Sequence, residues 1–241
     1  MKLLVIESSA SPAFAAAVAL AGEGARLAAI NLISEPRALA RDLIGAVDGV
    51  LAESAWSLAG LGAIVAGTGP GSWTSLRVGL TTAKTLAQAL TLPLVGVPYF
   101  EALAEAVRAT REPGSSVTLL TLAPCRPGEF YGAVYSLEGG SLEEMRAPAI
   151  DALECWVDFA RSGTNPVWLA GESAPLAAEW FANHAPDAVP SVFPVTPKVL
   201  ATAMARRAAL RLAAGPTDSP LTLVPLYLAP SNAERNFLAR P

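Results

Sequence analysis

The sequence predicts an α/β protein built from two similar halves, and two observations support this. Apolar runs of strand length alternate along the chain with longer segments of helical periodicity. Each half also follows the same plan of three meandering strands, a helix, a strand and a helix. Glu112-Pro-Gly-Ser115 interrupts the pattern between the halves. We therefore expect two lobes, residues 1–112 and 113–241, with the last residues packing back on the first lobe.

In the first half, short β-branched and leucine runs predict strands, and Pro36 is placed to begin a helix. The order of strand, helix and strand around residues 63–97 implies a right-handed parallel crossover. The expected elements are strands 2–6, 14–20, 26–32, 63–66 and 92–97, and helices from Pro36 to about Ser57, 75–90 and 99–111.

In the second half, the turn residues from Pro124 to Glu129 and the pair Gly139-Gly140 separate three apolar runs. Helical periodicity then returns with a single short strand inside it. The expected elements are strands 117–123, 130–137, 142–147 and 167–170, and helices 151–161, 174–183 and 199–213.

The chain is organised around the turn Gly67-Thr-Gly-Pro-Gly-Ser-Trp-Thr74, which joins a buried strand to a helix. Backbone amides of such a turn and the positive end of the helix dipole can hold an anion. The turn is not a Walker loop, because Lys84 lies about two and a half helical turns too far along. Phosphate contact and a tight turn capped by Ser72 or Thr74 both remain open.

The first two long helices are more apolar than one sheet requires. In helix 36–57, a second apolar stripe of Ala40, Ile44, Val47 and Leu51 lies beside the first. In helix 75–90, the small residues at Gly79, Ala83 and Ala87 would let another helix approach closely. Its opposite face is expected to be solvated and carries Arg77, Thr81, Lys84 and Gln88. We expect these helices to bury a second side, against each other or against a partner.

The composition excludes several classes of protein. The residues are 52% hydrophobic, with a mean hydropathy of +0.41, yet the longest apolar runs are shorter than a membrane span, and no secretion signal precedes Glu7. A cytoplasmic protein is expected. The net charge is −4 and the 17 Lys and Arg residues are scattered, which argues against direct nucleic-acid binding. Cys125, Cys155 and the single histidine, His184, make no disulfide framework or metal spacing, and His184 fits a helix end or the surface better than a metal site.

The central stretch from Gly67 to Gly79 resembles the GxGPGSFTGxRIG motif of the bacterial tRNA threonylcarbamoyladenosine biosynthesis protein TsaB, also called YeaZ. Weaker matches to the same family follow in order along nearly the whole chain. They are Leu3-Leu-Val-Ile-Glu-Ser-Ser9, Pro93-Leu-Val-Gly-Val97 with Glu101-Ala-Leu103, Arg126-Pro-Gly-Glu-Phe-Tyr131 and Pro225-Leu-Tyr-Leu228.

The resemblance implies an α/β fold of two duplicated lobes with mixed sheets, of the actin-like, sugar-kinase and Hsp70 type. It implies a non-catalytic scaffold subunit that pairs with the catalytic relative TsaD, with the ATPase TsaE joining, for threonylcarbamoylation of the adenosine next to the tRNA anticodon. Contact with tRNA would come only through that complex, and the chain could also pair with itself as a homodimer. The HxxxH metal pair of TsaD is absent from this sequence.

The same resemblance selects candidate site residues. In TsaB-like proteins the two long helices join the subunit to TsaD or to a second copy. The resemblance therefore implies that one apolar stripe on each of these helices is the partner interface. These residues are Leu39, Leu43, Ala46, Val50, Leu76, Leu80, Ala83 and Ala87. Glu7, Gly69, Gly71 and Ser72 are candidates for anion or nucleotide contact in a vestigial ATP and Mg²⁺ site; no other cofactor, no metal and no catalytic residue is expected.

Several residues differ from the family pattern, and these differences argue further against metal and nucleotide chemistry. Glu7 stands where the family usually has Asp, Pro124 stands where it has another Asp, and Ala229 replaces a common arginine. The family's HS pair is also missing around Ser34-Glu35-Pro36. The alternative function is a small ATP-binding phosphoryl-transfer enzyme of the same superfold, although the chain offers few of the groups that this reaction needs. A metallopeptidase is disfavoured by the missing histidine pair.

Overall fold

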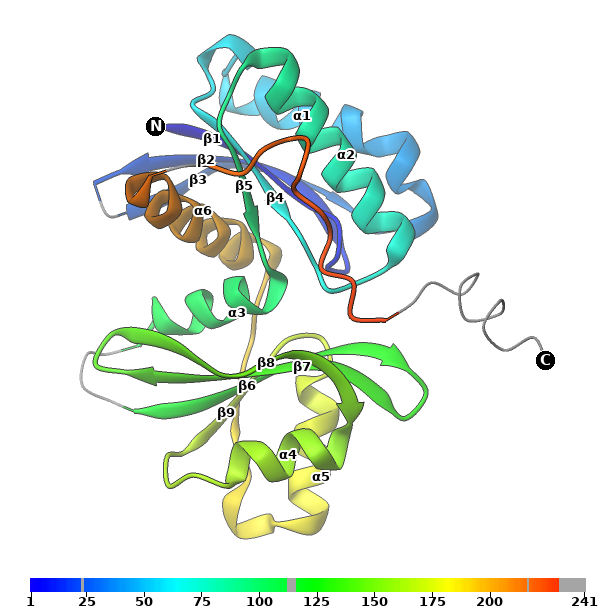
Figure 1. Cartoon of the computed structure of the whole chain (residues 1–241), viewed down its shortest axis with the longest axis vertical. Coiled ribbons are helices and arrows are strands. Elements are labelled where there is room, and N and C mark those ends of the chain that lie inside the picture. Colours follow the sequence, from blue (N-terminus) through cyan, green and yellow to red (C-terminus); the bar gives the residue numbers. More distant parts are fainter. Residues whose placement is uncertain (23, 112–115, 216, 230–241) are drawn as a thin grey trace, which may run out of the picture.

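The computed structural model describes residues 1–22, 24–111, 116–215 and 217–229. It shows two five-stranded mixed sheets, one in each half of the chain, with a layer of two helices between them (Figure 1). The predicted boundary at Glu112-Pro-Gly-Ser115 lies outside the described residues, so the lobe limits 1–112 and 113–241 stay a prediction.

The first sheet has the strand order β3-β2-β1-β4-β5. Its first three strands form an antiparallel meander, and β4 and β5 run parallel to β1, as the predicted crossover requires. The strands are β1 (Lys2–Glu7), β2 (Ala13–Ala21), β3 (Gly24–Ile33), β4 (Ala63–Gly67) and β5 (Leu94–Val97). Helices α1 (Leu39–Ser54) and α2 (Trp73–Leu90) pack side by side on one face of this sheet, and short 3₁₀ turns span Pro36–Ala38 and Leu58–Gly60.

The second sheet has the order β10-β9-β6-β7-β8, which is the order of the first sheet read from its other edge. Its strands are β6 (Val117–Arg126), β7 (Glu129–Glu138), β8 (Ser141–Ala152), β9 (Val167–Ala170) and β10 (Ser191–Phe193). Helices α4 (Leu153–Arg161) and α5 (Ala174–His184) accompany it, with a 3₁₀ turn at Pro186–Ala188. The predicted duplication is therefore confirmed at the level of topology, while the sequence missed β10 because three residues carry too little pattern to be recognised.

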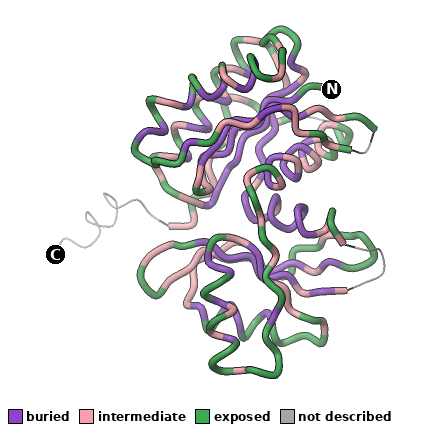
Figure 2. Tube along the Cα trace, turned by 180° about the vertical axis from the view of Figure 1, so that it is seen from behind, coloured by how far each residue is buried: buried purple, intermediate pink, exposed green. Residues whose placement is uncertain are grey.

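Helices α3 (Tyr99–Arg108) and α6 (Pro197–Ala214) form the layer between the sheets. Helix α6 packs on β2, β3 and β5 of the first sheet, whereas α3 packs on β6, β7 and β8 of the second and on α6. A single apolar core therefore includes residues of both sheets and both helices, and Figure 2 shows the buried positions gathered along these strands and inner helices. Each lobe has a second core beneath its outer helices.

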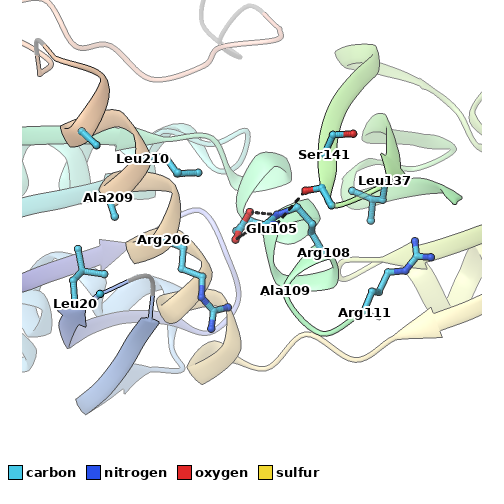
Figure 3. Close-up of a pocket in the computed structure, with 13 residues that line it drawn as sticks. Leu20, Glu105, Arg108, Ala109, Arg111, Leu137, Ser141, Arg206, Ala209 and Leu210 are labelled. Carbon is cyan, nitrogen blue, oxygen red and sulfur yellow. Dashed lines mark hydrogen bonds and ion pairs between the residues drawn. The ribbon is translucent and has the colours of Figure 1, made fainter. Parts of the chain in front are cut away.

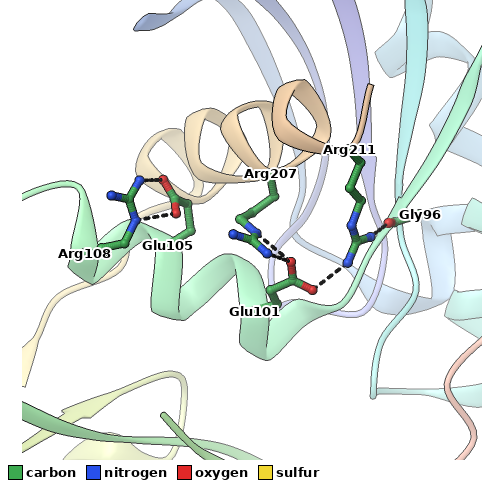
Figure 4. Close-up of polar contacts among 6 residues, drawn as sticks. All are labelled: Gly96, Glu101, Glu105, Arg108, Arg207 and Arg211. Atoms are coloured by element: carbon green, nitrogen blue, oxygen red, sulfur yellow. Dashed lines mark hydrogen bonds and ion pairs between the residues drawn. The ribbon is translucent and has the colours of Figure 1, made fainter. Parts of the chain in front are cut away.

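Glu101 on α3 is the centre of the polar contacts that join α3 to α6 (Figure 4). It accepts hydrogen bonds from Arg207 Nε at 2.5 Å and from Arg211 Nη2 at 2.6 Å. Arg211 also donates to the carbonyl oxygen of Gly96 in β5. The Glu101 side chain is only 13% exposed, so solvent screens these ion pairs less than it screens surface pairs.

Several element ends differ from the predictions. Helix α1 ends at Ser54 rather than near Ser57, because Ala55 adopts a left-handed conformation. Helix α3 ends at Arg108 rather than Arg111. Ser72 occupies the N-cap position of α2, but its side chain makes no capping hydrogen bond, and Thr74 lies inside the helix, so neither of the two alternative caps is formed.

The described residues after α6, 217–229, form a strap that runs back over the first lobe (Figure 1). Asp218 N donates to Leu94 O at 3.0 Å, and Leu226 N donates to Thr68 O at 2.7 Å. Lys84 Nζ of α2 donates to Leu223 O at 3.0 Å. The chain therefore does pack back on its first lobe, and Lys84 belongs to a contact with the strap rather than to a freely solvated face.

Candidate functional site

The glycine turn after β4 packs against the residues that follow β1. A Cβ atom at Gly67 would lie 2.1 Å from Glu7 Oε2, and one at Gly71 would lie 2.7 Å from Ser9 Cβ. Because both positions face side chains of the chain itself, the glycines are needed for close internal packing. The turn thus positions α2 and covers Glu7, which is a different use from cradling a phosphate.

The Glu7 side chain points into this packing and is fully buried. Its Oε1 accepts hydrogen bonds from the backbone N–H and the hydroxyl of Ser9 and from Ala10 N, and its Oε2 has no partner among the described residues. A carboxylate enclosed in this way cannot reach a ligand without rearrangement. The structure therefore does not support the prediction that Glu7 contacts a nucleotide. Gly69, Gly71 and Ser72 stay predictions as anion contacts; Gly69 is buried and Ser72 is exposed.

Burial raises the pKa of Glu7 above its ordinary value, and hydrogen bonds from Ser9 and Ala10 offset this only in part. Because the folded pKa exceeds the unfolded one, the stability that Glu7 contributes is fully present below the unfolded pKa and is lost as the pH rises through the folded pKa. We expect Glu7→Gln to remove this loss, which is at most about 1.4 kcal/mol per pH unit. Urea unfolding of both proteins from pH 4 to pH 8 measures it; parallel pH profiles would contradict the expectation.

The cleft between the lobes is narrow beside this turn. Ser11 N in the β1–β2 connection donates to Glu172 Oε1 of the second lobe at 2.9 Å. The cavity behind this contact has a volume of about 100 Å³ and is lined by Pro12, Tyr99 and Thr196, among others. Pockets for cofactors and other small molecules are usually about 300–1,000 Å³. This cavity is therefore smaller than a usual cofactor pocket.

Burial determines which stripe of each long helix faces the sheet. The eight residues predicted as the partner interface all lie in the chain's own core, with exposures from 0% to 9%. The prediction that they contact a partner directly is therefore wrong. They are Leu39, Leu43, Ala46, Val50, Leu76, Leu80, Ala83 and Ala87. The second stripe of α1 divides, because Val47 and Leu51 are buried while Ala40 and Ile44 are exposed.

We give the name α1–α2 face to six uncharged residues on the outward side of these helices, Ala40 and Ile44 of α1 with Thr74, Val78, Thr81 and Thr85 of α2. Charged residues of the same helices, among them Arg41, Asp48 and Arg77, are exposed as well. Ile44 is 52% exposed, Val78 is partly buried, and none of the six residues is charged. Interface centres are depleted in charged residues in the same way. The helices that the sequence singled out thus expose an apolar side chain, Ile44, together with both uncharged polar and charged residues.

An aromatic contact that the sequence analysis missed joins α2 to the strap. The rings of Trp73 and Tyr227 stack with centroids 3.8 Å apart. Arg77 Cζ lies 4.5 Å from the Trp73 ring centroid, and Arg77 Nε donates to the Tyr227 hydroxyl at 3.2 Å. Trp73 and Tyr227 belong to two of the motifs that matched the family, which was the available signal that these distant segments meet.

The remaining candidate residues have structural surroundings. His184 ends α5, where its Nδ1 is 2.9 Å from Trp180 O and its ring stacks on Trp180, as expected for a helix end. Cys125 and Cys155 are free thiols. In the described part of the chain, no three His, Cys, Asp or Glu side chains gather as metal ligands. The described helices also include none that is long and apolar enough to cross a membrane.

Comparison with known proteins connects this geometry to a family. A family model described as TsaD, tRNA N6-adenosine threonylcarbamoyltransferase, matches residues 34–215. The chain is 31% identical to the tRNA threonylcarbamoyladenosine biosynthesis protein TsaB of Bacillus subtilis over 116 residues, which are 48% of this chain and 48% of that protein. It is 33% identical to TsaB of Escherichia coli over 135 residues, 56% of this chain and 55% of that protein. The matches thus span about half the length of these two relatives.

Among solved structures, YeaZ from Pseudomonas aeruginosa superimposes with a TM-score of 0.70 and 21% identity, over 94% of this chain and 99% of that one. Two lobes with one strand order and a cleft between them define an α/β protein of the actin-like ATPase fold. Because the family model described as TsaD matches residues 34–215, more than half of the chain, the chain belongs to that family, and it is similar to the TsaB proteins over about half of its length.

Proposed function

We propose that this chain is a non-catalytic scaffold subunit for the threonylcarbamoylation of the adenosine next to the anticodon in tRNA. The observation that carries the proposal is the enclosure of Glu7 beside a small cavity between the lobes. Glu7 is enclosed by Ser9, Ala10 and the glycine turn, and the cavity behind the Ser11–Glu172 contact has only about 100 Å³. A protein of this fold that does not hold a nucleotide can still contribute a surface to an assembly. No cofactor is therefore assigned to it.

The partner in this proposal is a TsaD-like catalytic subunit, and the contact is the α1–α2 face. The family membership supports this choice, and so does the exposed apolar side chain of Ile44. In the absence of that subunit, the same face would join two copies of the chain. A TsaE-like ATPase would join the complex, tRNA would bind only through the complex, and the complex would work in the cytoplasm.

Reconstitution tests the role directly. The full chain is added to purified TsaC-, TsaD- and TsaE-like proteins with unmodified tRNA and ATP, and the modified nucleoside is quantified by mass spectrometry after digestion. We expect modification to depend on this chain. Equal modification without it would refute the proposed function while leaving the family assignment intact.

Calorimetric titration of the isolated chain with ATP and Mg²⁺ distinguishes the scaffold from the phosphoryl-transfer alternative. Because Glu7 is enclosed and the cavity beside it is small, we expect no binding in the micromolar range. Micromolar binding would instead favour an enzyme of the same superfold.

A further inference from the structure

A groove of about 720 Å³ lies between the two lobes, away from the cleft described above. It is lined by Leu20 at the end of β2, by the end of α3, by the β7–β8 turn and by one side of α6 (Figure 3). The cleft and the groove lie at opposite ends of β2. Phe14, near the first end, pairs with Glu7 beside the cleft, whereas Leu20, near the last end, lines the groove and donates its backbone N–H to Met1 O. The groove is thus separate from both the cleft and the α1–α2 face.

One arginine of the groove is held in a fixed position by a buried carboxylate. The Glu105 side chain is 0% exposed and receives hydrogen bonds from Arg108 Nε at 2.8 Å and Nη2 at 2.7 Å. Arg108 Nη1 also donates to Gly140 O at 3.2 Å. These bonds occupy three of the five N–H groups of a guanidinium, which leaves two that can bind a further acceptor.

Two more arginines border the same space. Arg206 projects from α6 and makes no hydrogen bond or ion pair with the residues that the structure describes (Figure 3). Arg111 follows α3, and its guanidinium lies 5.1 Å from the Trp168 ring centroid. With Glu105 as the one carboxylate among the lining residues, the formal charge of the described lining is about +2 in a chain whose net charge is −4.

Apart from Ser141 and two glycines, the rest of the wall is apolar. It is formed by Leu20, Ala109, Leu137, Ala209, Leu210 and Ala213. Small-molecule sites typically combine such an apolar wall with a few polar groups in defined positions, in volumes of about 300–1,000 Å³. Guanidinium groups bind carboxylate, sulfonate and phosphate oxygens in bidentate geometry.

We propose that this groove binds a small amphipathic organic anion, with its acidic group on Arg206 and Arg108 and its apolar body against Leu20 and Leu210. The excess of positive charge selects an anion, and the apolar wall selects an organic one over an inorganic ion. This inference does not depend on the proposed scaffold role.

The test uses the full chain with 8-anilinonaphthalene-1-sulfonate, an aromatic sulfonate that fluoresces in apolar surroundings, and with octanoate as competitor. We expect saturable binding, displacement by octanoate but not by inorganic phosphate at the same concentration, and binding weaker by about tenfold or more in Arg206→Gln. Arg206 has no described partner to lose, so this variant should fold normally.

Two control variants and a map of NMR chemical-shift changes test where the probe binds. Arg37→Gln removes an exposed arginine in the 3₁₀ turn before α1, and Leu221→Ser removes the most exposed apolar side chain of the described strap. Both variants should bind the probe as the original chain does. In ¹H–¹⁵N spectra the octanoate-induced shifts should centre on Ala109, Gly140 and Ala209. No binding, unchanged binding in Arg206→Gln, equal displacement by phosphate, or shifts centred elsewhere would each overturn the proposal.

Discussion

Replacing Ile44 with arginine should weaken the pairing of this chain with its TsaD-like partner about thirtyfold or more, while the chain itself stays folded. Ile44 is 52% exposed on α1 and is the most exposed large apolar side chain of the α1–α2 face. An arginine there would place a charge in a surface that loses its water on association, and burying an unpaired charge in this way costs about 2 kcal/mol or more. Co-purification and calorimetry with the partner measure the effect, and circular dichroism reports the fold.

Leu176→Arg is the matched control for this variant. Leu176 is 48% exposed on α5 in the second lobe, so the substitution introduces the same charge at a similar exposure away from the proposed interface. It should leave pairing unchanged. Equal pairing by the Ile44 variant and the original chain would refute the assignment of the α1–α2 face, whether or not the scaffold role holds.

Replacing Trp156 with alanine should lower the free energy of unfolding by about 3–5 kcal/mol, which is the usual cost of removing a buried tryptophan. Trp156 is 0% exposed in the core between α4 and the second sheet. Its ring fills the space beside Gly132, where a Cβ would lie 2.6 Å from it, and its Nε1 donates to Phe130 O at 3.2 Å. In thermal unfolding followed by circular dichroism, we expect the midpoint to fall by about 10 °C.

Trp180→Ala is the control for the Trp156 variant. Trp180 is only partly buried and stacks on the exposed ring of His184, so its removal leaves a smaller cavity and should cost less. A Trp156 variant as stable as the Trp180 variant would show that the second lobe can collapse around the missing ring.

The local elements could be predicted because their signals are local. Strand Val167–Ala170 was predicted with its observed bounds, since four apolar residues lie between turn residues. The parallel pairing of β4 with β5 was also predicted, from the order of strand, helix and strand, whereas the strand order of each sheet came from the structure. Strand β10 escaped prediction because three partly exposed residues carry no period, and its pairing with β9 supplies the signal that the sequence lacks.

At the candidate site, the direction in which side chains point could not be predicted from the sequence. Glu7 and the glycine turn were predicted as anion or nucleotide contacts, but a carboxylate beside a glycine turn has the same pattern whether it faces a ligand or the core. Only the contact of Glu7 with Gly67 and its hydrogen bonds from Ser9 decide that it faces the core. Trp73 and Tyr227 are 154 residues apart, so no local pattern could predict their stacking.

By itself, the sequence determined the duplicated α/β plan, the family resemblance and the two long helices with more apolar surface than one sheet covers. The tertiary structure alone decided which stripes those helices bury. Helical periodicity places residues on a common side of a helix but does not reveal which side meets the sheet, because that depends on neighbours distant in sequence. Those neighbours bury Leu43 and Ala83 and leave Ile44 at the surface.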